Sequence, residues 1–310
     1  MVRSAQILVW LVAVSLLPQA FAQTDSRPAG NTIAFASDTQ APMWIESVFL
    51  KDRQNRRATG LVFDEIIRTH PLGLFIFGDV VSLGHSDKAW KTVDVYLKNM
   101  RDAGIPVYAT LGNHELMQKP GKGMANFQRR FPEHKPTGYL QVVDSVAIIM
   151  LNSNFGSLTK AQIEKQQQWL KDTLNALDSN KAILAIIMGC HHPPYTNSKL
   201  VKSSTPVQEQ FVKPFLASRK AKLFITGHSH AFEYFKTGGK DFLIIGGGGG
   251  LHHPLNTGKD KLDDQSLMYK PFFHYLTVSI RPHELYVLSH QLREDFTGFE
   301  DGFSVKIPLK

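Results

Sequence analysis

The chain has 310 residues, of which 43% are hydrophobic, 20% are charged and one, Cys190, is a cysteine. This length favours one large α/β domain that is stabilised by its own core, and the lone cysteine excludes an internal disulfide. The net charge of +8 is dispersed along the chain, so it favours anionic substrates without forming a nucleic-acid-binding motif.

The first 22 residues are typical of a secretory signal peptide. Arg3 gives a basic start, an apolar run extends from Ile7 to Leu17, and the small residues Ala20 and Ala22 precede Gln23. The run is far shorter than the roughly 20 apolar residues that cross a bilayer. We therefore expect cleavage after residue 22, export to the periplasm or the medium, and no membrane span in the mature chain.

Strand-like and helical patterns alternate in the first part of a domain predicted to cover residues 30–310. The order from Thr32 is a strand, helices around Trp44–Leu50 and Ala58–Arg68, a strand to Asp79, a helix around Trp90–Ala103, and a strand to Gly112. Alternation of this kind predicts parallel strand pairing.

The second part begins with a hairpin pattern, Tyr139–Val143 and Val146–Leu151. The capping-box form of Thr159–Gln162 predicts a helix from Thr159 to about Leu177. The remaining predicted elements are a strand ending at Cys190, a short helix near Val207–Ala217, strands before Gly227 and over Phe242–Ile245, a hairpin of His274–Ile280 and Glu284–His290, and room for an edge strand after Leu292.

Five polar motifs follow apolar, strand-like runs. In chain order they are Asp38-Thr39-Gln40, Gly78-Asp79, Gly112-Asn113-His114-Glu115, His191-His192-Pro193 and Gly227-His228-Ser229-His230. Strand ends are where α/β proteins place their chemistry. With 23 glycines and 13 histidines, the Gly-His-x-His pattern is expected by chance only about 0.04 times. Since an Asp after a strand is often only a turn residue, the ordered set carries more weight than any single motif.

These residue types suit a binuclear metal centre. Two divalent cations about 3.5–4 Å apart need a shared anionic oxygen, neutral nitrogen ligands and open positions for water and substrate. Asp79 is the natural bridge. His228 and His230 can serve different metals if the chain bends between them, and Asn113 offers a neutral amide oxygen.

From about Ile33 to His290 the chain resembles the calcineurin-like metallophosphoesterases, which include purple acid phosphatases and Ser/Thr protein phosphatases. The resemblance implies an α/β fold in four layers, an αββα sandwich of two mixed sheets, with two divalent ions (Mn, Fe or Zn) at the strand ends. It implies one metal on Asp38, Asp79 and His230. It implies a second metal on Asp79, Asn113, His191 and His228, and gives His114 the role of assisting the leaving group.

Two positions depart from that family pattern. Gln40 stands where relatives commonly have a His, and a Gln oxygen is a weaker ligand than imidazole, so the first metal is expected to bind less tightly. Ser82 stands three residues after Asp79, where purple acid phosphatases have Tyr and protein phosphatases have Asp. The branch of the family is therefore open, and His85 is a candidate to complete the metal shell.

Several further residues have more than one reading. His192 either contacts phosphate, orients His191 or supports the turn at Pro193. Glu115 either orients a site residue or caps the following segment. Gly246–Gly250, followed by His252 and His253, either brings backbone amides to a phosphate or is a closely packed or flexible loop, and we favour the packed or flexible loop.

The sequence predicts a metal-dependent phosphoesterase of small phosphorylated substrates, in which a metal-bridging hydroxide attacks phosphorus and His114 assists departure. Phosphomonoesters are the first expectation, with phosphodiesters or nucleotides second. One alternative is a serine hydrolase with Ser229 in a Gly-His-Ser-His-Ala elbow, followed by Asp260 and His274. A second alternative is a non-catalytic binder of phosphorylated ligands. The oligomeric state is open.

Overall fold

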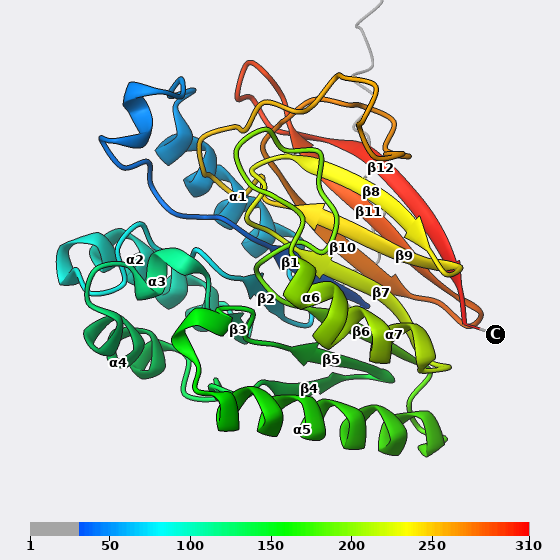
Figure 1. Cartoon of the computed structure of the whole chain (residues 1–310). Helices are drawn as coiled ribbons and strands as arrows, with labels where there is room; N and C mark the ends of the chain where they lie inside the picture. Colours follow the sequence, from blue (N-terminus) through cyan, green and yellow to red (C-terminus); the bar gives the residue numbers. More distant parts are fainter. Residues whose placement is uncertain (1–30, 310) are drawn as a thin grey trace, which may run out of the picture.

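Two six-stranded sheets lie face to face at the centre of the computed structural model, which describes residues 31–309 (Figure 1). The predicted signal peptide lies outside the described residues. In this part of the chain no helix is long and apolar enough to cross a membrane.

The first sheet has the order β12-β11-β10-β1-β2-β3. Strands β1, β2 and β3 are parallel to one another, and β10, β11 and β12 extend the sheet in antiparallel fashion. Their bounds are Thr32–Ala36 (β1), Leu74–Phe77 (β2), Val107–Thr110 (β3), His274–Ile280 (β10), Glu284–Leu292 (β11) and Phe299–Pro308 (β12). The predicted edge strand after Leu292 is β12.

The second sheet has the order β4-β5-β6-β7-β9-β8. Four central strands are parallel, and β4 and β8 pair antiparallel at the edges. Their bounds are Tyr139–Val143 (β4), Val146–Met150 (β5), Ala185–Gly189 (β6), Ala221–Thr226 (β7), Phe232–Thr237 (β8) and Lys240–Ile245 (β9).

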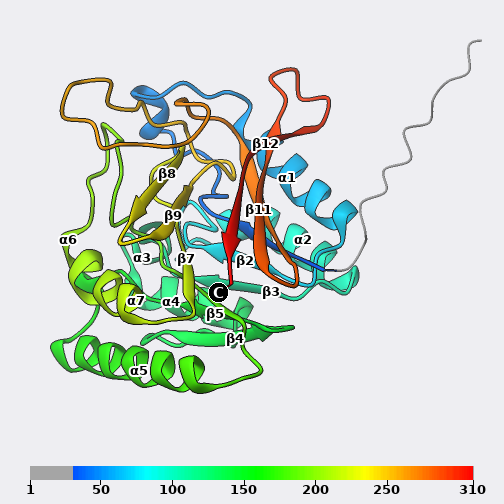
Figure 2. The same ribbon diagram turned by 90° about the vertical axis from the view of Figure 1, so that its right-hand side faces the viewer.

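Helices cover the outer face of each sheet, as Figure 2 shows with α1 and α2 on the right and α5 to α7 at the lower left. The helices are α1 (Asn55–Thr69), α2 (Asp87–Asp102), α3 (Asn113–Leu116), α4 (Pro120–Arg130), α5 (Lys160–Ser179), α6 (Thr205–Val207), a π-helical turn (Gln208–Val212) and α7 (Lys213–Ala217). The 3₁₀ turns η1 (Glu46–Val48) and η2 (Phe155–Ser157) complete the set.

Three hydrophobic layers hold these elements together. One lies between the sheets and includes Phe77, Ile187 and Leu276; the other two lie between each sheet and its helices. The predicted four-layer αββα sandwich of two mixed sheets is therefore confirmed. Its physical basis is that parallel strands with apolar residues on both faces must be covered on both sides.

One predicted helix is wrong, and one strand was missed. No α-helix covers Trp44–Leu50, where only η1 forms, because Trp44, Val48 and Phe49 are 79%, 65% and 83% exposed and find no core to pack against. Strand β8 was not predicted. Its signal was the Gly238-Gly239 pair, whose left-handed φ values of 59° and 75° make the tight turn into β9.

Candidate metal centre

The loops after β1, β2, β3, β6 and β7 meet at one end of the two sheets. They bring together all seven residues predicted as metal ligands, together with His114. Because parallel strands share an edge for their carboxyl ends, side chains up to 192 positions apart in sequence, Asp38 and His230, become neighbours. Most of these side chains are buried, whereas Asn113 and His228 are half-buried and mark the side that solvent reaches.

One ligand group contains Asp79, His191 and His228, whose ligand atoms all lie within 4.8 Å of one another. Nε2 of His191 lies 3.1 Å from His228 Nδ1, 3.1 Å from Asn113 Oδ1 and 3.2 Å from Asp79 Oδ2. Ligand atoms at about 2.1 Å from one zinc-like cation stand roughly 3 to 3.5 Å apart. The spacing therefore fits one shared cation.

The hydrogen bonds of His191 show why a positive charge is needed there. Its Nδ1 lies 2.9 Å from the carbonyl oxygen of Phe77, which can only accept, so Nδ1 carries the proton. Nε2 of the neutral ring then directs its lone pair at oxygen lone pairs of Asn113 and Asp79. Either a second proton or a cation must lie between them.

The shifts in pKa describe the same demand for positive charge. Burial lowers the pKa of His191, but the Asp79 and Asp38 carboxylates outweigh it and raise the pKa to about 9. Burial raises the pKa of Asp79, but His191 and His114 outweigh it and hold the pKa far below its ordinary value. The cluster stabilises a positive charge at its middle, which a bound cation would supply.

The other ligand group contains Asp38, Asp79 and His230. Nδ1 of His230 donates to the carbonyl of Leu251 at 2.7 Å, so Nε2 is again the free nitrogen, 3.3 Å from Asp38 Oδ1. That carboxylate oxygen is buried without a hydrogen-bond partner. A buried, unpartnered carboxylate oxygen beside a ring lone pair is costly without a cation. Since both groups contain Asp79, the residues fit two cations that share this carboxylate.

Gln40 lies at the ligand group of Asp38, Asp79 and His230. Only one orientation of its amide gives both ends suitable partners: the nitrogen then donates to the carbonyls of Asp38 at 3.1 Å and Asp79 at 3.0 Å. In that orientation the amide oxygen lies 3.3 Å from Nε2 of His230. The oxygen therefore points to the same place as Asp38 Oδ1, where a cation would bind.

Three of these loop residues have left-handed backbone conformations. The φ values are 58° for Asp38, 50° for Asp79 and 65° for His228. Each such residue costs on the order of 1–3 kcal/mol unless its surroundings hold it. Asp38 Oδ2 accepts the His228 N–H at 2.9 Å, and Asp79 Oδ1 accepts the His114 N–H at 2.9 Å, so the strained loops brace one another.

Glu115 holds the loop that carries Asp79. Its Oε2 accepts the N–H groups of Asp79 at 3.0 Å and Gly112 at 2.7 Å, and its Oε1 accepts those of Val80 at 2.8 Å and Val81 at 3.2 Å. Burial and the Asp79 charge raise the pKa of Glu115 to about 7, against the four donors. The contacts support both of its readings: those with Asp79, Val80 and Val81 orient a site residue, and that with Gly112 caps α3.

His114 lies beside Asp79 at the edge of the cluster. Its Nδ1 donates to the carbonyl of Ser82 at 2.9 Å, and its Nε2 lies 3.8 Å from Asp79 Oδ2 and 3.7 Å from Glu46 Oε1. Burial lowers the pKa of His114, but Asp79, Ser82 and Glu46 outweigh it and raise the pKa. Sequence reasoning missed Glu46, which lies in the turn η1 and belongs to none of the five motifs.

The glycine run Gly246–Gly250 packs against the loops that carry the site residues. A Cβ at Gly246 would lie 2.0 Å from the Ser229 carbonyl oxygen, one at Gly248 2.4 Å from that of Ser37, and one at Gly250 2.5 Å from the His230 ring. All five positions are buried. Close packing, one form of the favoured reading, is confirmed.

Other candidates lie around the cluster. His192 Nδ1 pairs with the Ser153 hydroxyl at 2.8 Å, and the His253 ring stacks on His230 with centroids 4.2 Å apart. His85 belongs to neither ligand group. The rings of His192 and His253 lie against the cluster, and neither belongs to a ligand group.

Ser229 is fully buried, and its hydroxyl donates to Glu233 at 2.8 Å. The partners suggested for a serine-hydrolase triad have other contacts: Asp260 accepts from Asn256 at 3.1 Å, and His274 Nδ1 lies 2.9 Å from the Phe272 carbonyl. The triad of Ser229, Asp260 and His274 therefore does not form.

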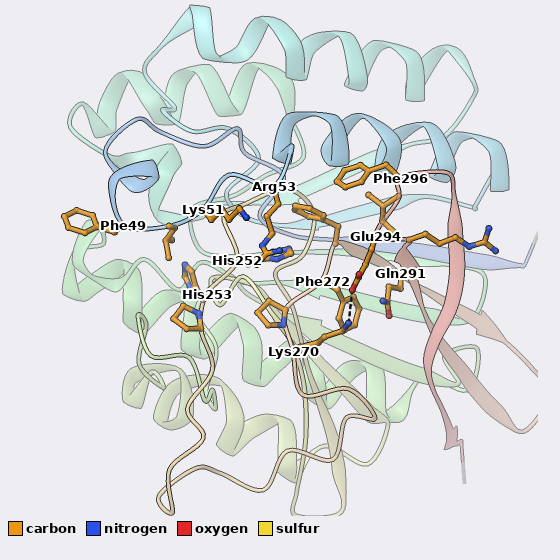
Figure 3. Close-up of a pocket in the computed structure, with 16 residues that line it drawn as sticks. Phe49, Lys51, Arg53, His252, His253, Lys270, Phe272, Gln291, Glu294 and Phe296 are labelled. Atoms are coloured by element: carbon orange, nitrogen blue, oxygen red, sulfur yellow. Dashed lines mark hydrogen bonds and ion pairs between the residues drawn. The ribbon is translucent and has the colours of Figure 1, made fainter.

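Two pockets flank the cluster. One of about 400 Å³ is lined by Asn113 and His192 together with Met117, Asn154 and Phe155. The other, of about 620 Å³, reaches the cluster through His253 and is shown in Figure 3.

Residues 32–232 match the family model described as "Calcineurin-like phosphoesterase". No curated protein matches the chain significantly.

Solved structures share the fold at low sequence identity. A purple acid phosphatase from yellow lupin (Lupinus luteus) is 13% identical with a TM-score of 0.66, and the match covers 89% of this chain but only 53% of that protein. GAP50 of Plasmodium, described as the anchor in the inner membrane complex, is 17% identical with a TM-score of 0.63, covering 90% and 89% of the two chains. A dimetal phosphatase from Danio rerio is 14% identical with a TM-score of 0.56, covering 90% and 99%.

Replacement of Glu115 by Gln is expected to lower the free energy of unfolding by about 2–4 kcal/mol, because an NH₂ group would face two buried N–H donors. Chemical denaturation measures this change. The matched control is Glu164→Gln on the exposed face of α5, expected within about 0.5 kcal/mol of the wild type. Equal stability of all three proteins would contradict the anchoring role of Glu115.

Replacement of Gln40 by His is expected to increase the metal retained after dialysis. An imidazole nitrogen binds divalent cations more strongly than an amide oxygen, so the first site should hold its ion more tightly. Mass spectrometry gives the metal content of the wild type and of Gln40→His. Two tightly held metals per chain already in the wild type would show that the first site is not weak.

Proposed function

This chain belongs to the calcineurin-like phosphoesterase family, and on that premise we propose that it is a metal-dependent phosphoesterase with a binuclear centre. The observation that carries the proposal is the pair of ligand groups that share Asp79. Asp38, Gln40, Asp79 and His230 would hold one cation. Asp79, Asn113, His191 and His228 would hold the other. The ion identity is left to experiment among Mn, Fe and Zn.

Two cations so placed would supply Lewis acidity, activating water near neutral pH and drawing charge from the phosphate oxygens. The chain's own residues position the metal ligands and orient their donor atoms. The carbonyls of Phe77 and Leu251 fix the tautomers of His191 and His230, and Glu115 fixes the loop of Asp79. Each contact restricts the motion of a ligand side chain before the substrate binds. That freedom therefore does not have to be lost on reaching the transition state.

His114 is proposed as the general acid. Its Nδ1 is tied to the Ser82 carbonyl, which turns Nε2 toward Asp79 and Glu46. The neighbouring carboxylates favour the protonated ring, so Nε2 holds a proton that can pass to the departing ester oxygen. Glu46 would help to keep that proton in place before the phosphoester bond breaks.

Phosphomonoesters are the first substrate class proposed, with phosphodiesters or nucleotides second. The surplus of positive charge, +8 over the whole chain, supports an anionic substrate of either kind. The signal-peptide pattern of residues 1–22 supports export of the mature protein, which we include in the proposal.

Replacement of Asp79 by Asn is expected to lower turnover of 4-nitrophenyl phosphate by at least about a thousandfold and to reduce metal content at both sites. The shared anionic oxygen would be lost, and metal Lewis acidity is worth several kcal/mol, with each 1.36 kcal/mol a factor of ten. Activity is measured with each metal added back, beside metal analysis. The control, Asp64→Asn on the exposed face of α1, removes the same charge elsewhere. Full activity and both metals in Asp79→Asn would exclude the shared-carboxylate centre.

Replacement of Ser229 by Ala separates this proposal from a serine hydrolase. The proposal gives the hydroxyl no chemistry, so turnover should stay within about twofold, while one lost hydrogen bond to Glu233 costs roughly 1 kcal/mol of stability. Activity that disappears in Ser229→Ala but survives chelation would decide for the serine hydrolase.

A non-catalytic role is the second candidate, because GAP50, a fold neighbour, is described as an anchor. The same kinetic measurements decide it. Binding of phosphate with no turnover by the metal-loaded wild type would favour a phospho-ligand binder.

A further inference from the structure

The pocket of about 620 Å³ lies beside the metal centre and is not part of it (Figure 3). Its walls come from the segment after β1, from the loop after the glycine run, from the residues just before β10, and from the end of β11 and the residues after it. His253 is a wall residue, and its ring stacks on that of His230, a proposed ligand of the first metal. Glu46, three positions before the wall residue Phe49, lies 3.7 Å from His114. A substrate held at the metals therefore has this pocket as its neighbour.

The pocket has positive charge that the chain itself does not neutralise. Lys270 pairs with Glu294 at 3.1 Å, and Arg293 lies 3.6 Å from Glu300. Lys51 and Arg53 are exposed, and among residues 31–309 neither has a carboxylate within ion-pair distance. In Figure 3 both side chains lie in the pocket wall, with Arg53 near His252. Two unpaired cations in a concave wall favour an anionic ligand.

The same wall presents aromatic surface to solvent. Phe49 is 83% exposed although it lines the pocket, whereas the wall residues Phe272 and Phe273 are buried. The His252 ring packs against Phe273 in a tilted arrangement with centroids 4.3 Å apart, and its buried Nε2 has no hydrogen-bond partner. A planar ligand ring could cover Phe49 by stacking and offer a polar edge to the His252 nitrogen.

We propose that this pocket binds the part of the substrate beyond the reacting phosphate, and that the substrate class is a nucleotide with a second phosphate. The base would stack on Phe49, and the second phosphate would meet Lys51 and Arg53. This inference rests on the proposed function and narrows it. In the reaction, a water oxygen bonds to phosphorus, the bond from phosphorus to the ribose oxygen breaks, and the ribose oxygen takes a proton to leave as an alcohol.

Four phosphomonoesters separate the contribution of the ring from that of the second charge. Adenosine 3′,5′-bisphosphate has both, adenosine 5′-monophosphate has only the ring, fructose 1,6-bisphosphate has only the second phosphate, and glycerol 1-phosphate has neither. The wild type should give the highest kcat/KM with adenosine 3′,5′-bisphosphate.

The double variant Lys51→Gln/Arg53→Gln tests the charge. The ratio of kcat/KM for adenosine 3′,5′-bisphosphate over the monophosphate should fall about tenfold, as expected for two lost charge contacts of roughly 0.7 kcal/mol each. The control Arg56→Gln/Lys91→Gln removes the same net charge from exposed positions on α1 and α2 outside the pocket, and its ratio should equal that of the wild type. An equal fall in both double variants, or in neither, would overturn the proposal.

The variant Phe49→Leu tests the ring by removing the aromatic face while keeping an apolar side chain. The ratio for adenosine 3′,5′-bisphosphate over fructose 1,6-bisphosphate should fall roughly three- to tenfold. Trp44→Leu, 79% exposed in the same segment but outside the pocket, is its control and should leave the ratio unchanged. An unchanged ratio in Phe49→Leu would overturn the stacking.

Equilibrium dialysis separates failure of the pocket from failure of the proposed function. If the wild type hydrolyses none of the four esters, its assignment as a phosphomonoesterase fails. Retention of adenosine 3′,5′-bisphosphate by the wild type, weakened about tenfold in Lys51→Gln/Arg53→Gln, would still support the pocket. Equal retention by both proteins would overturn it.

Discussion

Lone pairs that converge on two points between the strand ends are the constraint on which the site depends. The carbonyls of Phe77 and Leu251 take the outer protons of His191 and His230, so the inner nitrogens have nothing to donate. Carboxylate and amide oxygens face those nitrogens at 3.1–3.3 Å. Without positive charge at each point the arrangement would repel itself. The need for cations is therefore built into the backbone through the two carbonyls as well as into the ligands.

Close backbone packing is the second half of that constraint. The loops approach so closely that a Cβ at Gly112 would lie 2.1 Å from Asp79 Oδ1, and one at Gly227 2.3 Å from Asp38 Oδ2. Asp38 and Asp79 have left-handed conformations, and Glu115 accepts three hydrogen bonds from the strained turn of Asp79 and a fourth from Gly112. Strain at a functional site persists only where the surroundings determine it in this way.

The sequence predicted the parts of this molecule that are local or periodic. Helix α5 follows from the capping box of Thr159 and Gln162, and the site motifs follow from polar residues at strand ends. Glu46 could not be predicted, because its place near His114 depends on the path of an irregular, exposed segment. The contacts of Glu115 with Asp79, Val80 and Val81 were equally hidden, since they join residues 34 to 36 positions apart in the chain. The domain bounds, the signal peptide and the individual metal roles stay predictions.

Charge balance favours an anionic ester as the substrate. The ligand set holds two carboxylates, Asp38 and Asp79, and otherwise neutral nitrogen and amide groups, so two divalent cations would leave a surplus of about two positive charges, or about one once the hydroxide nucleophile is counted. A phosphomonoester dianion and a phosphodiester anion would both be attracted by that surplus. Gln40 matters here in a second way, because like the commoner His it adds no negative charge. The departure from the family pattern therefore weakens one ligand without changing the charge that the substrate meets.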